Sequence, residues 1–491
     1  MNSFWQSHPA LLIALLALLS SALAIHPHPL YLLLLFLLLT PVIQKKAPRR
    51  LFLYATLFAA LSYPLALWRT PPSLAAPIEG HGIFHIENLS ITASPFNRSY
   101  CYRGVLKEFQ GSDGSSFSKL PCTLFHPLKQ APLADRDYHI EGTLLQKTKH
   151  SFSLKPKKQK EWIPIEKTFS IAKWRFTAKR AVVSYVKRHI SDSASSSFLS
   201  ALITGEIDEK SLRLDFSRLG LQHLLAISGF HFSFFAWLCN LLLRPFFSFK
   251  PRSALLITAL CAYFLFLGSA PSILRAFTAL SLFSLAAPLK RRSSPLNLLG
   301  AALIVELLID PLILTHLSFQ LSFLCTLALL LFAPLMHLLC RSFFKVRTQL
   351  ELQSMSLRDK HGYLLGSLLC KTLSINLAIF LFSLPVLLHL FHKFPLLSLL
   401  YNLFFPFCVF LSLLLFCLSL PFPFLHTINS LWTAAILQLT SHPPLYCDLV
   451  VRYSLPFSTT LISLALLFYI GALFWNANKS DGCSFIQKGR R

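Results

Sequence analysis

The chain has 491 residues, of which 54% are hydrophobic and only 13% are charged, and its mean hydropathy is +0.56. A soluble fold could not bury so many apolar side chains, so the composition excludes the soluble globular class and predicts an integral membrane protein with many spans. The formal net charge of +26 fits basic cytoplasmic loops, but it also fits a surface that binds DNA, RNA or anionic lipid.

The N-terminal segment, residues 1–70, is predicted to hold three membrane helices. Apolar runs cover residues 11–25, 30–43 and 51–68, and a basic cluster at residues 45–50 separates the second run from the third. Basic loops stay in the cytoplasm, so the third run should lead outward. Because neither Lys nor Arg precedes the first run, we interpret the segment as a retained hairpin and not as a cleaved signal peptide.

Residues 71–170 are predicted to form an extracytoplasmic β-domain. Apolar and polar residues alternate at 83–86, 100–106, 138–145 and 151–154, which is typical of strands. Their number and length suit a small barrel such as the OB-fold, although from spacing alone any small β-domain is the simpler interpretation. Cys101 and Cys122 lie in this region and would form a disulfide in an oxidising compartment; two free thiols are the equal alternative.

Residues 171–220 are predicted to be a basic helical linker. The first part, about residues 171–190, has helical periodicity that places Trp174, Ala178, Val182 and Val186 near one face. A basic amphipathic helix of this kind lies on phospholipid more often than it contacts nucleic acid, and both roles stay open.

Residues 221–491 are almost entirely apolar and are predicted to form a bundle of membrane helices. Basic loops fall on alternate connections between the spans, as cytoplasmic loops must. This alternation agrees with a β-domain on the extracytoplasmic side. The side of the membrane on which the C-terminus lies stays open. The predicted spans are residues 221–243, 254–268, 272–289, 296–309, 313–339, 373–391, 396–420 and 455–475.

The predicted fold class is therefore a polytopic α-helical membrane protein of about 11 spans with a small extracytoplasmic β-barrel domain, OB-like, inserted after the third span. No phosphate-binding loop, zinc-protease motif or nucleophile elbow occurs in the sequence. We therefore expect no catalytic residues, no metal site and no cofactor.

Polar residues inside the apolar runs are the candidate site residues, because a polar group at bilayer depth usually faces a bundle interior or a water-filled cavity. The alternative for each is a packing role, and for Arg275 it is an ion pair with Glu306 or Asp310. The candidates are His223, Ser228, Gly229, His231, Arg275, Asp310 and Gln320.

Residues 220–231, with the sequence GLQHLLAISGFH, resemble the signature of the ComEC competence family, Gly-Leu-x-His-Leu-Leu-Ala-Ile-Ser-Gly-Leu-His, and depart from it at Phe230. The LITG segment at residues 202–205 and the PSILRA segment at residues 271–276 match two further elements of the family. Residues 310–323 resemble a third block of the family, in which Ser318 replaces the usual Gly. The order and spacing of these elements also agree.

The resemblance implies a channel in the bacterial inner membrane that takes up single-stranded DNA during natural transformation. The outer β-domain would receive the strand, and lysines at its C-terminal end would contact phosphates. The implied partners are single-stranded DNA, membrane lipids and other competence proteins, namely a DNA receptor and a cytoplasmic motor or single-strand-binding protein. The candidate DNA contacts are Lys147, Lys149, Lys155, Lys157 and Lys158.

Many family members carry a metallo-β-lactamase-like domain with a His-x-His-x-Asp-His cluster, which this sequence lacks. We therefore expect a short form that is not an enzyme and that depends on a separate nuclease. The alternatives are a small-molecule or lipid transporter and a non-conducting scaffold for a DNA-uptake complex. The oligomeric state stays open.

Overall fold

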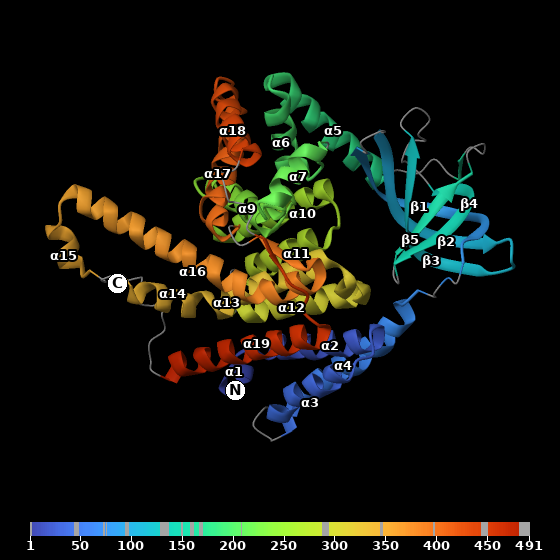
Figure 1. Ribbon diagram of the computed structural model, residues 1–491, viewed down its shortest axis with the longest axis horizontal. Helices are drawn as coiled ribbons and strands as arrows, with labels where there is room; N and C mark the ends of the chain where they lie inside the picture. The colour runs from blue at the N-terminus through green and yellow to red at the C-terminus, as the bar shows by residue number, and fades with distance from the viewer. Residues whose placement is uncertain are drawn as a thin grey trace. The chain divides into compact units, whose positions relative to one another are not determined.

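The computed structural model describes residues 2–43, 49–71, 74, 76–93, 98–127, 137–148, 151–157, 162–165, 170–207, 209–286, 294–343, 347–395, 398–442 and 450–480 (Figure 1). The chain divides into two compact units. Unit 1 comprises residues 1–67, 278–406 and 445–491, and unit 2 comprises residues 68–277 and 407–444. This partition differs from the predicted domains, because unit 2 combines the β-domain and the basic linker with the first helices of the apolar region.

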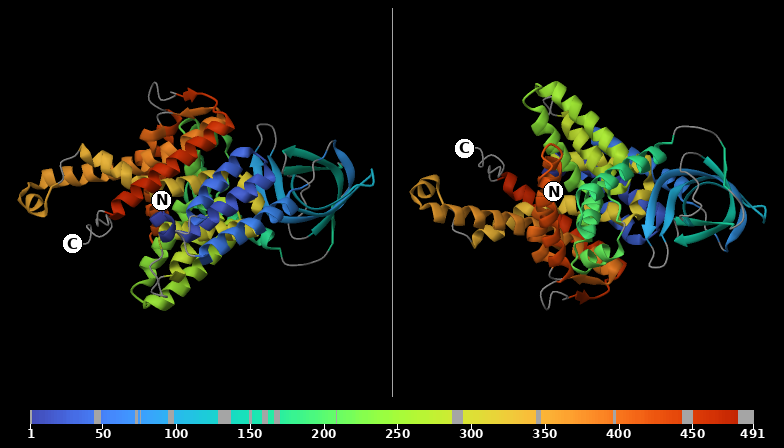
Figure 2. Two further views of the ribbon diagram at one scale, coloured as in Figure 1. Left: turned by 90° about the horizontal axis from the view of Figure 1, so that it is seen from below. Right: turned by 90° about the horizontal axis from the view of Figure 1, so that it is seen from above.

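Unit 2 begins with a six-stranded sheet. Its strand order is β1-β2-β3-β5-β4-β6, and β4 also pairs with β1. The pairings among the first five strands therefore form a closed ring, β1-β2-β3-β5-β4-β1. Every pairing is antiparallel except that between β3 and β5, and the strands curve as the ring requires (Figure 2). The strands are β1 (Ile78–Ala93), β2 (Arg98–Gly111), β3 (Ser116–Pro127), β4 (Asp137–Thr148), β5 (Ser151–Pro156) and β6 (Ile163–Pro164).

The four predicted strand segments lie within β1, β2, β4 and β5, and the observed strands extend beyond them. The sequence did not predict β3, because Pro121 and adjacent polar residues interrupt its alternation. Aliphatic and aromatic side chains form the buried core of the sheet; Phe84, Tyr102 and Phe152 are almost fully buried there. The strands pack closely: Gly104 faces the carbonyl of His85 with no room for a side chain.

Of the two alternatives for Cys101 and Cys122, the structure shows no disulfide, and both thiols are free and buried. Cys101 lies opposite Phe125, whereas Cys122 lies opposite Gly104, so the two cysteines are three positions apart along β3. Three strand positions span about 10 Å, and a disulfide needs Cα atoms within about 7 Å. The free-thiol alternative therefore holds. Burial raises the pKa of the Cys122 thiol to about 12, which makes it unreactive.

The basic linker forms three helices, α5 (Ile171–His189), α6 (Ser193–Thr204) and α7 (Lys210–Arg218). The helix predicted at about 171–190 is confirmed by α5, whose N-cap Ser170 accepts a hydrogen bond from the Lys173 backbone at 3.2 Å. Of the residues that the periodicity places near one face, Val186 is buried and Trp174 is 45% exposed. The buried residues are Ala172, Arg175, Lys179, Val183 and Val186.

The remaining helices of unit 2 are α8 (Gln222–Leu225), α9 (Gly229–Leu243), α10 (Phe249–Leu267), the start of α11 (Pro271–Ala286), the end of α17 (Ser398–Ser419) and α18 (Leu425–Ser441). The single span predicted at 221–243 is therefore two helices separated by a break. Within α17 and α18, Asn429 exchanges hydrogen bonds with the side chain and the carbonyl of Ser412, both at 3.1 Å. These paired polar groups fasten the two helices to each other.

Unit 1 contains α1 (Asn2–Ser7), α2 (Pro9–Ile25), α3 (Pro29–Ile43), α4 (Arg49–Arg69) up to residue 67, α12 (Pro295–Ile309), a 3-10 helix η2 (Pro311–Thr315), α13 (Leu317–Leu331), α14 (Ala333–Ser342), α15 (Gln349–Ser354), α16 (Leu357–Phe391) and α19 (Phe457–Ser480). The short strands β7 (Lys393–Pro395) and β8 (Val450–Arg452) pair with each other. Helices α2 and α12 touch directly, since a side chain at Gly300 would lie 2.5 Å from the backbone of Ala10.

Four of the described helices are long and apolar enough to cross a membrane: α10, α16, α17 and α19. A fifth span results if α13 and α14, bent by 50° at residue 332, count as one. Shorter apolar helices cover Pro9–Ile25, Pro29–Thr40, Gly229–Leu243, Pro271–Ala286 and Pro295–Ile309. The chain therefore has several helices able to span a membrane, while the count of about 11 spans stays a prediction.

Candidate functional site

The Ser-Gly-x-His segment forms the break between α8 and α9. The backbone is extended at Ala226 and Ser228, and α9 begins at Gly229. The Ser228 backbone N–H donates to Nδ1 of His231 at 3.3 Å, and the Ser228 hydroxyl lies 3.4 Å from the same nitrogen. Ser228 and His231, which the sequence placed on one helix face, are thus partners that start α9.

His231 is only 2% exposed. Because its Nδ1 accepts the backbone hydrogen bond, the neutral ring carries its proton on Nε2. That Nε2 is buried and has no hydrogen-bond partner among the described residues. The packing alternative explains Nδ1 well but leaves the Nε2 donor unused, which is unusual for a buried polar group.

The N-terminal turn of α11 lies against this break. The Ser272 hydroxyl donates to the Ile227 carbonyl at 3.0 Å. A Cβ atom added to Gly229 would lie 3.1 Å from Nη2 of Arg275, so the guanidinium sits directly beside the first residue of α9. Ser228, Gly229, His231 and Arg275 therefore come together in one place, which we call the helix-break site. His223 lies on α8 with its side chain exposed.

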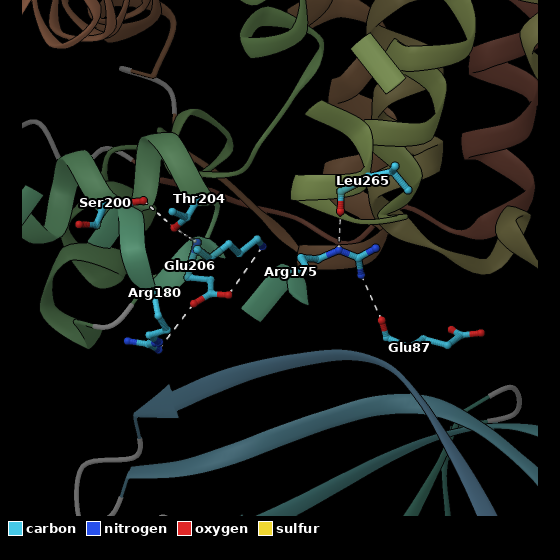
Figure 3. Close-up of polar contacts among 8 residues, drawn as sticks. Glu87, Arg175, Arg180, Ser200, Thr204, Glu206 and Leu265 are labelled. Atoms are coloured by element: carbon cyan, nitrogen blue, oxygen red, sulfur yellow. Dashed lines mark hydrogen bonds and ion pairs between the residues drawn. The ribbon is translucent and has the colours of Figure 1, made fainter. Parts of the chain in front are cut away.

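The LITG segment packs on the same break. Gly205 ends α6 with a φ of 75°, a conformation that favours glycine, and a Cβ atom there would lie 2.8 Å from Cγ1 of Ile227. Thr204 beside it is buried; its hydroxyl donates to the Ser200 carbonyl at 2.7 Å and accepts from the Glu206 backbone at 3.2 Å (Figure 3). The motifs at residues 202–205 and 220–231, about 20 residues apart in the sequence, thus pack against each other.

Glu206, the residue after Gly205, connects these two packed motifs to α5. Its carboxylate lies 3.7 Å from Nζ of Lys179 and 3.6 Å from Nη2 of Arg180 (Figure 3). Burial lowers the pKa of Lys179 more than the Glu206 carboxylate raises it. Sequence reasoning missed this group, although Arg175 and Lys179 are spaced by four residues on one helix face and an acid follows the LITG segment.

Arg175 makes a second connection from α5. Its Nε donates to the Leu265 carbonyl at 2.9 Å and its Nη1 donates to the Glu87 carbonyl at 3.1 Å (Figure 3). Leu265 lies in the last turn of α10, where carbonyls lack helical partners, and Glu87 lies at an irregularity in the pairing of β1 with β2. Arg175 therefore joins β1, α5 and α10, a role that the sequence did not indicate.

Asp310 and Gln320 belong to unit 1 and hold a turn. Asp310 accepts a hydrogen bond from the Leu312 backbone at 3.0 Å, and Gln320 donates to the Leu314 carbonyl at 2.8 Å. Both side chains therefore fix η2 against α13, which is a packing role. Because Arg275 belongs to unit 2, its predicted pairing with Glu306 or Asp310 joins two units and stays a prediction.

The described lysines of the β-domain are exposed. Nζ of Lys147, at the end of β4, lies 4.9 Å from the centre of the Phe125 ring on β3. Lys155 is exposed on β5, and Lys157 forms an ion pair with Glu79 at 3.2 Å. Lys149 and Lys158 lie outside the described residues.

An acid at the start of β4 also has two side-chain partners. Asp137 on β4 contacts both Lys107 and His85, the latter through Nδ1 at 2.5 Å. Partial burial alone would raise the pKa of Asp137, but the hydrogen bonds from Lys107 and His85 outweigh it and hold that pKa below its ordinary value. Among the described residues, no three His, Cys, Asp or Glu side chains lie close enough together to hold a metal ion.

Comparison with known proteins identifies the family. The family model described as Competence protein matches residues 202–480, more than half of the chain, and this range contains the helix-break site. ComE operon protein 3 of Bacillus subtilis (strain 168) is 31% identical over 199 residues, which is 40% of this chain and 22% of that relative. No solved structure matches the chain. With its family signature and more than half of its length matched, the chain belongs to the ComEC family of competence proteins.

Proposed function

We propose that this protein conducts single-stranded DNA across the bacterial inner membrane during natural transformation. The observation that carries the proposal is the helix-break site, where Ser228, Gly229, His231 and Arg275 converge. Helix breaks at membrane depth are tolerated where they line a cavity or are buried in protein. A guanidinium beside such a break is suited to a phosphate, because its planar donors match phosphate oxygens.

The β-domain would receive the strand before it enters the helices. A ring of five strands with one parallel contact, between β3 and β5, supports an OB-like fold. OB-folds bind oligonucleotides with loops that include the one between the fourth and fifth strands. Lys147 lies at the start of that connection and faces Phe125, which supports a surface that pairs charge with base stacking.

The proposed arrangement places the β-domain on the extracytoplasmic side, because the basic cluster at residues 45–50 is a cytoplasmic signal. The protein would act as a conduit and not as an enzyme. Other competence proteins would deliver the DNA and draw it inward, and a separate nuclease would degrade the other strand. Membership of the competence family supports this division of labour.

Binding of labelled single-stranded DNA to the purified full-length protein, measured across a range of salt concentrations, tests the proposal. We expect affinity to fall steeply as salt rises, because phosphate contacts release counterions. Replacing Lys147 and Lys155 with Gln should reduce both the affinity and the salt slope. Affinity that ignores salt, or equal binding of a neutral solute, would instead favour a small-molecule or lipid transporter.

Uptake of labelled DNA into a deletion strain complements the binding measurement. Expression of the wild-type protein should restore uptake into the cytoplasm. If DNA accumulates outside the membrane equally with and without the protein, and never enters, a conducting role is contradicted and a scaffold role is favoured.

A further inference from the structure

Helix α16 is longer than a membrane crossing requires. It has 35 residues, Leu357–Phe391, which at about 1.5 Å per residue corresponds to roughly 52 Å. The hydrocarbon core is about 30 Å thick and takes about 20 residues. Counted back from Phe391, a crossing begins near Thr372, directly after Lys371. Residues 357–371 therefore extend beyond the core.

This extension, with α15, forms an arm that projects from the other helices of unit 1 (Figures 1 and 2). One of its faces packs on α14, where Sγ of Cys370 lies 4.0 Å from Nδ1 of His337. The other face presents Leu364, Leu365 and Leu368, which are 64%, 58% and 60% exposed. An apolar face of this kind is unfavourable in water and favourable at the boundary between headgroups and acyl chains.

Next to these leucines the arm contains an open hollow of about 410 Å³. The hollow lies at the corner between α15 and α16. Its lining residues are Arg347, Met355, Arg358, Asp359, Gly362 and Tyr363.

Local hydrogen bonds fix the corner. The Arg347 backbone N–H donates to the hydroxyl of Tyr363 at 3.4 Å. The Ser356 hydroxyl donates to the Asp359 carboxylate at 2.7 Å and accepts from its backbone N–H at 3.3 Å. Asp359 is thus engaged in capping α16, and the two guanidinium groups leave the hollow with an excess of positive charge.

The charge of the arm matches an anionic membrane surface. Residues 341–371 contain six Lys and Arg residues and two Asp and Glu residues. Basic side chains next to a membrane helix are attracted to anionic headgroups, at about 1 kcal/mol each.

We infer that the hollow between Arg347 and Arg358 binds the phosphate of an anionic phospholipid while Leu364, Leu365 and Leu368 enter its acyl layer. The three exposed leucines beside the hollow are aliphatic, which suits acyl chains. Tyr363 is the one aromatic residue of the lining; it is half-buried and its hydroxyl bonds the Arg347 backbone, whereas a single-stranded nucleic acid is bound by exposed aromatic surfaces for stacking. The inference does not depend on DNA conduction, because it concerns a different unit and a different ligand.

Lipid binding to the full-length protein in neutral detergent tests the inference. Native mass spectrometry would compare phosphatidylglycerol with phosphatidylcholine in the absence of DNA. We expect the wild-type protein to retain phosphatidylglycerol in preference. Substitution of Arg347→Gln with Arg358→Gln should weaken that retention on the order of tenfold.

A steric variant tests the hollow without changing its charge. A side chain at Gly362 meets open space, so Gly362→Phe should fill the hollow while leaving α16 folded. We expect it to reduce phosphatidylglycerol retention as the double Arg variant does. The matched control is Lys250→Gln with Arg252→Gln, which removes the same charge from the first turn of α10 and should retain the lipid.

Three outcomes would overturn the inference. One is equal retention of both lipids by the wild-type protein, and a second is an equal loss in the Lys250 and Arg252 control. The third is displacement of the lipid by glycerol phosphate or by a single-stranded oligonucleotide at comparable concentrations, since the hollow would then be a soluble-anion or nucleic-acid site.

Discussion

Lys179 on α5 and Glu206 after α6 face each other in a buried ion pair, with Nζ 3.7 Å from the carboxylate and both side chains only 7% exposed. Glu206 directly follows Gly205, which packs on Ile227, the residue before the helix-break site. The Lys179–Glu206 pair therefore links the basic helix to the segment that positions the candidate site. Because both charges are removed from water, loss of either partner would leave an unpaired buried charge and destabilise the folded protein.

Glu206→Gln should destabilise the protein by about 3–5 kcal/mol, because it leaves Lys179 buried without its countercharge. Thermal unfolding of the purified protein in detergent would show the change as a lower midpoint. The matched control is Glu108→Gln on an exposed position of β2, for which we expect little change.

Joint replacement, Lys179→Met with Glu206→Leu, should recover most of the lost stability, since it removes both buried charges. If the joint variant is no more stable than Glu206→Gln, desolvation of an unpaired charge is the wrong explanation.

Arg175→Lys should weaken the connection among β1, α5 and α10, because a lysine ammonium cannot serve both carbonyls with the geometry of the guanidinium. Loss of one charged hydrogen bond corresponds to about 1.5–3 kcal/mol. Limited proteolysis should cut the segment between α10 and α11 faster in the variant. Arg103→Lys, at an exposed position of β2, is the control; equal proteolysis of both variants would contradict the role of Arg175.

The stability of the β-domain should fall in acid through Asp137. Its pKa in the folded protein is lowered, so its stabilising contribution is full above the ordinary carboxyl pKa, about 3.9, and is lost as pH falls below that value. Unfolding of the full-length protein, followed by the near-ultraviolet signal, should therefore shift mainly as the pH falls below about 4. Asp137→Asn should reduce this acid dependence; an unchanged pH profile would show that other carboxyls dominate it.

Hydropathy and motif patterns predicted the membrane class, helix α5 and the members of the helix-break site, because each depends on local sequence. The span predicted at residues 221–243 ran through the break, since Ala226 and Ile227 are as apolar as their neighbours and only the backbone geometry departs from a helix. The motif identified the residues but not the conformation that brings Gly229 to Arg275.

Contacts between distant segments were not predictable from periodicity. Periodicity placed Trp174 near one face with Val186, but it did not indicate that Arg175 and Lys179 are buried, since carbonyls and a carboxylate from other elements satisfy them. Likewise, the spacing of Cys101 and Cys122 said nothing about the register of β2 on β3, which keeps them apart.

Gly229→Ala should reduce DNA uptake without reducing stability. The added Cβ would lie 3.1 Å from Nη2 of Arg275, so the guanidinium must move by a few tenths of an ångström. Alanine favours a helix over glycine by up to about 1 kcal/mol, so α9 itself should not weaken. Uptake and thermal midpoint are measured together; a lower midpoint with normal uptake would assign Gly229 to packing alone.

Arg275→Ala should abolish DNA uptake while the protein stays inserted and abundant, because the proposed role of the guanidinium is to accompany phosphates and not to fasten helices. Membrane abundance is followed by immunoblot and uptake by labelled DNA in the complemented deletion strain. Arg275→Lys keeps the charge but lacks the planar donors, so partial uptake is expected. Arg252→Ala, in the first turn of α10 where the side chain is half-buried beside the Phe249 ring, is the control and should behave as the wild type. If Arg275→Ala instead removes the protein from the membrane, Arg275 serves a structural ion pair, and the helix-break site loses its proposed cationic contact with the strand.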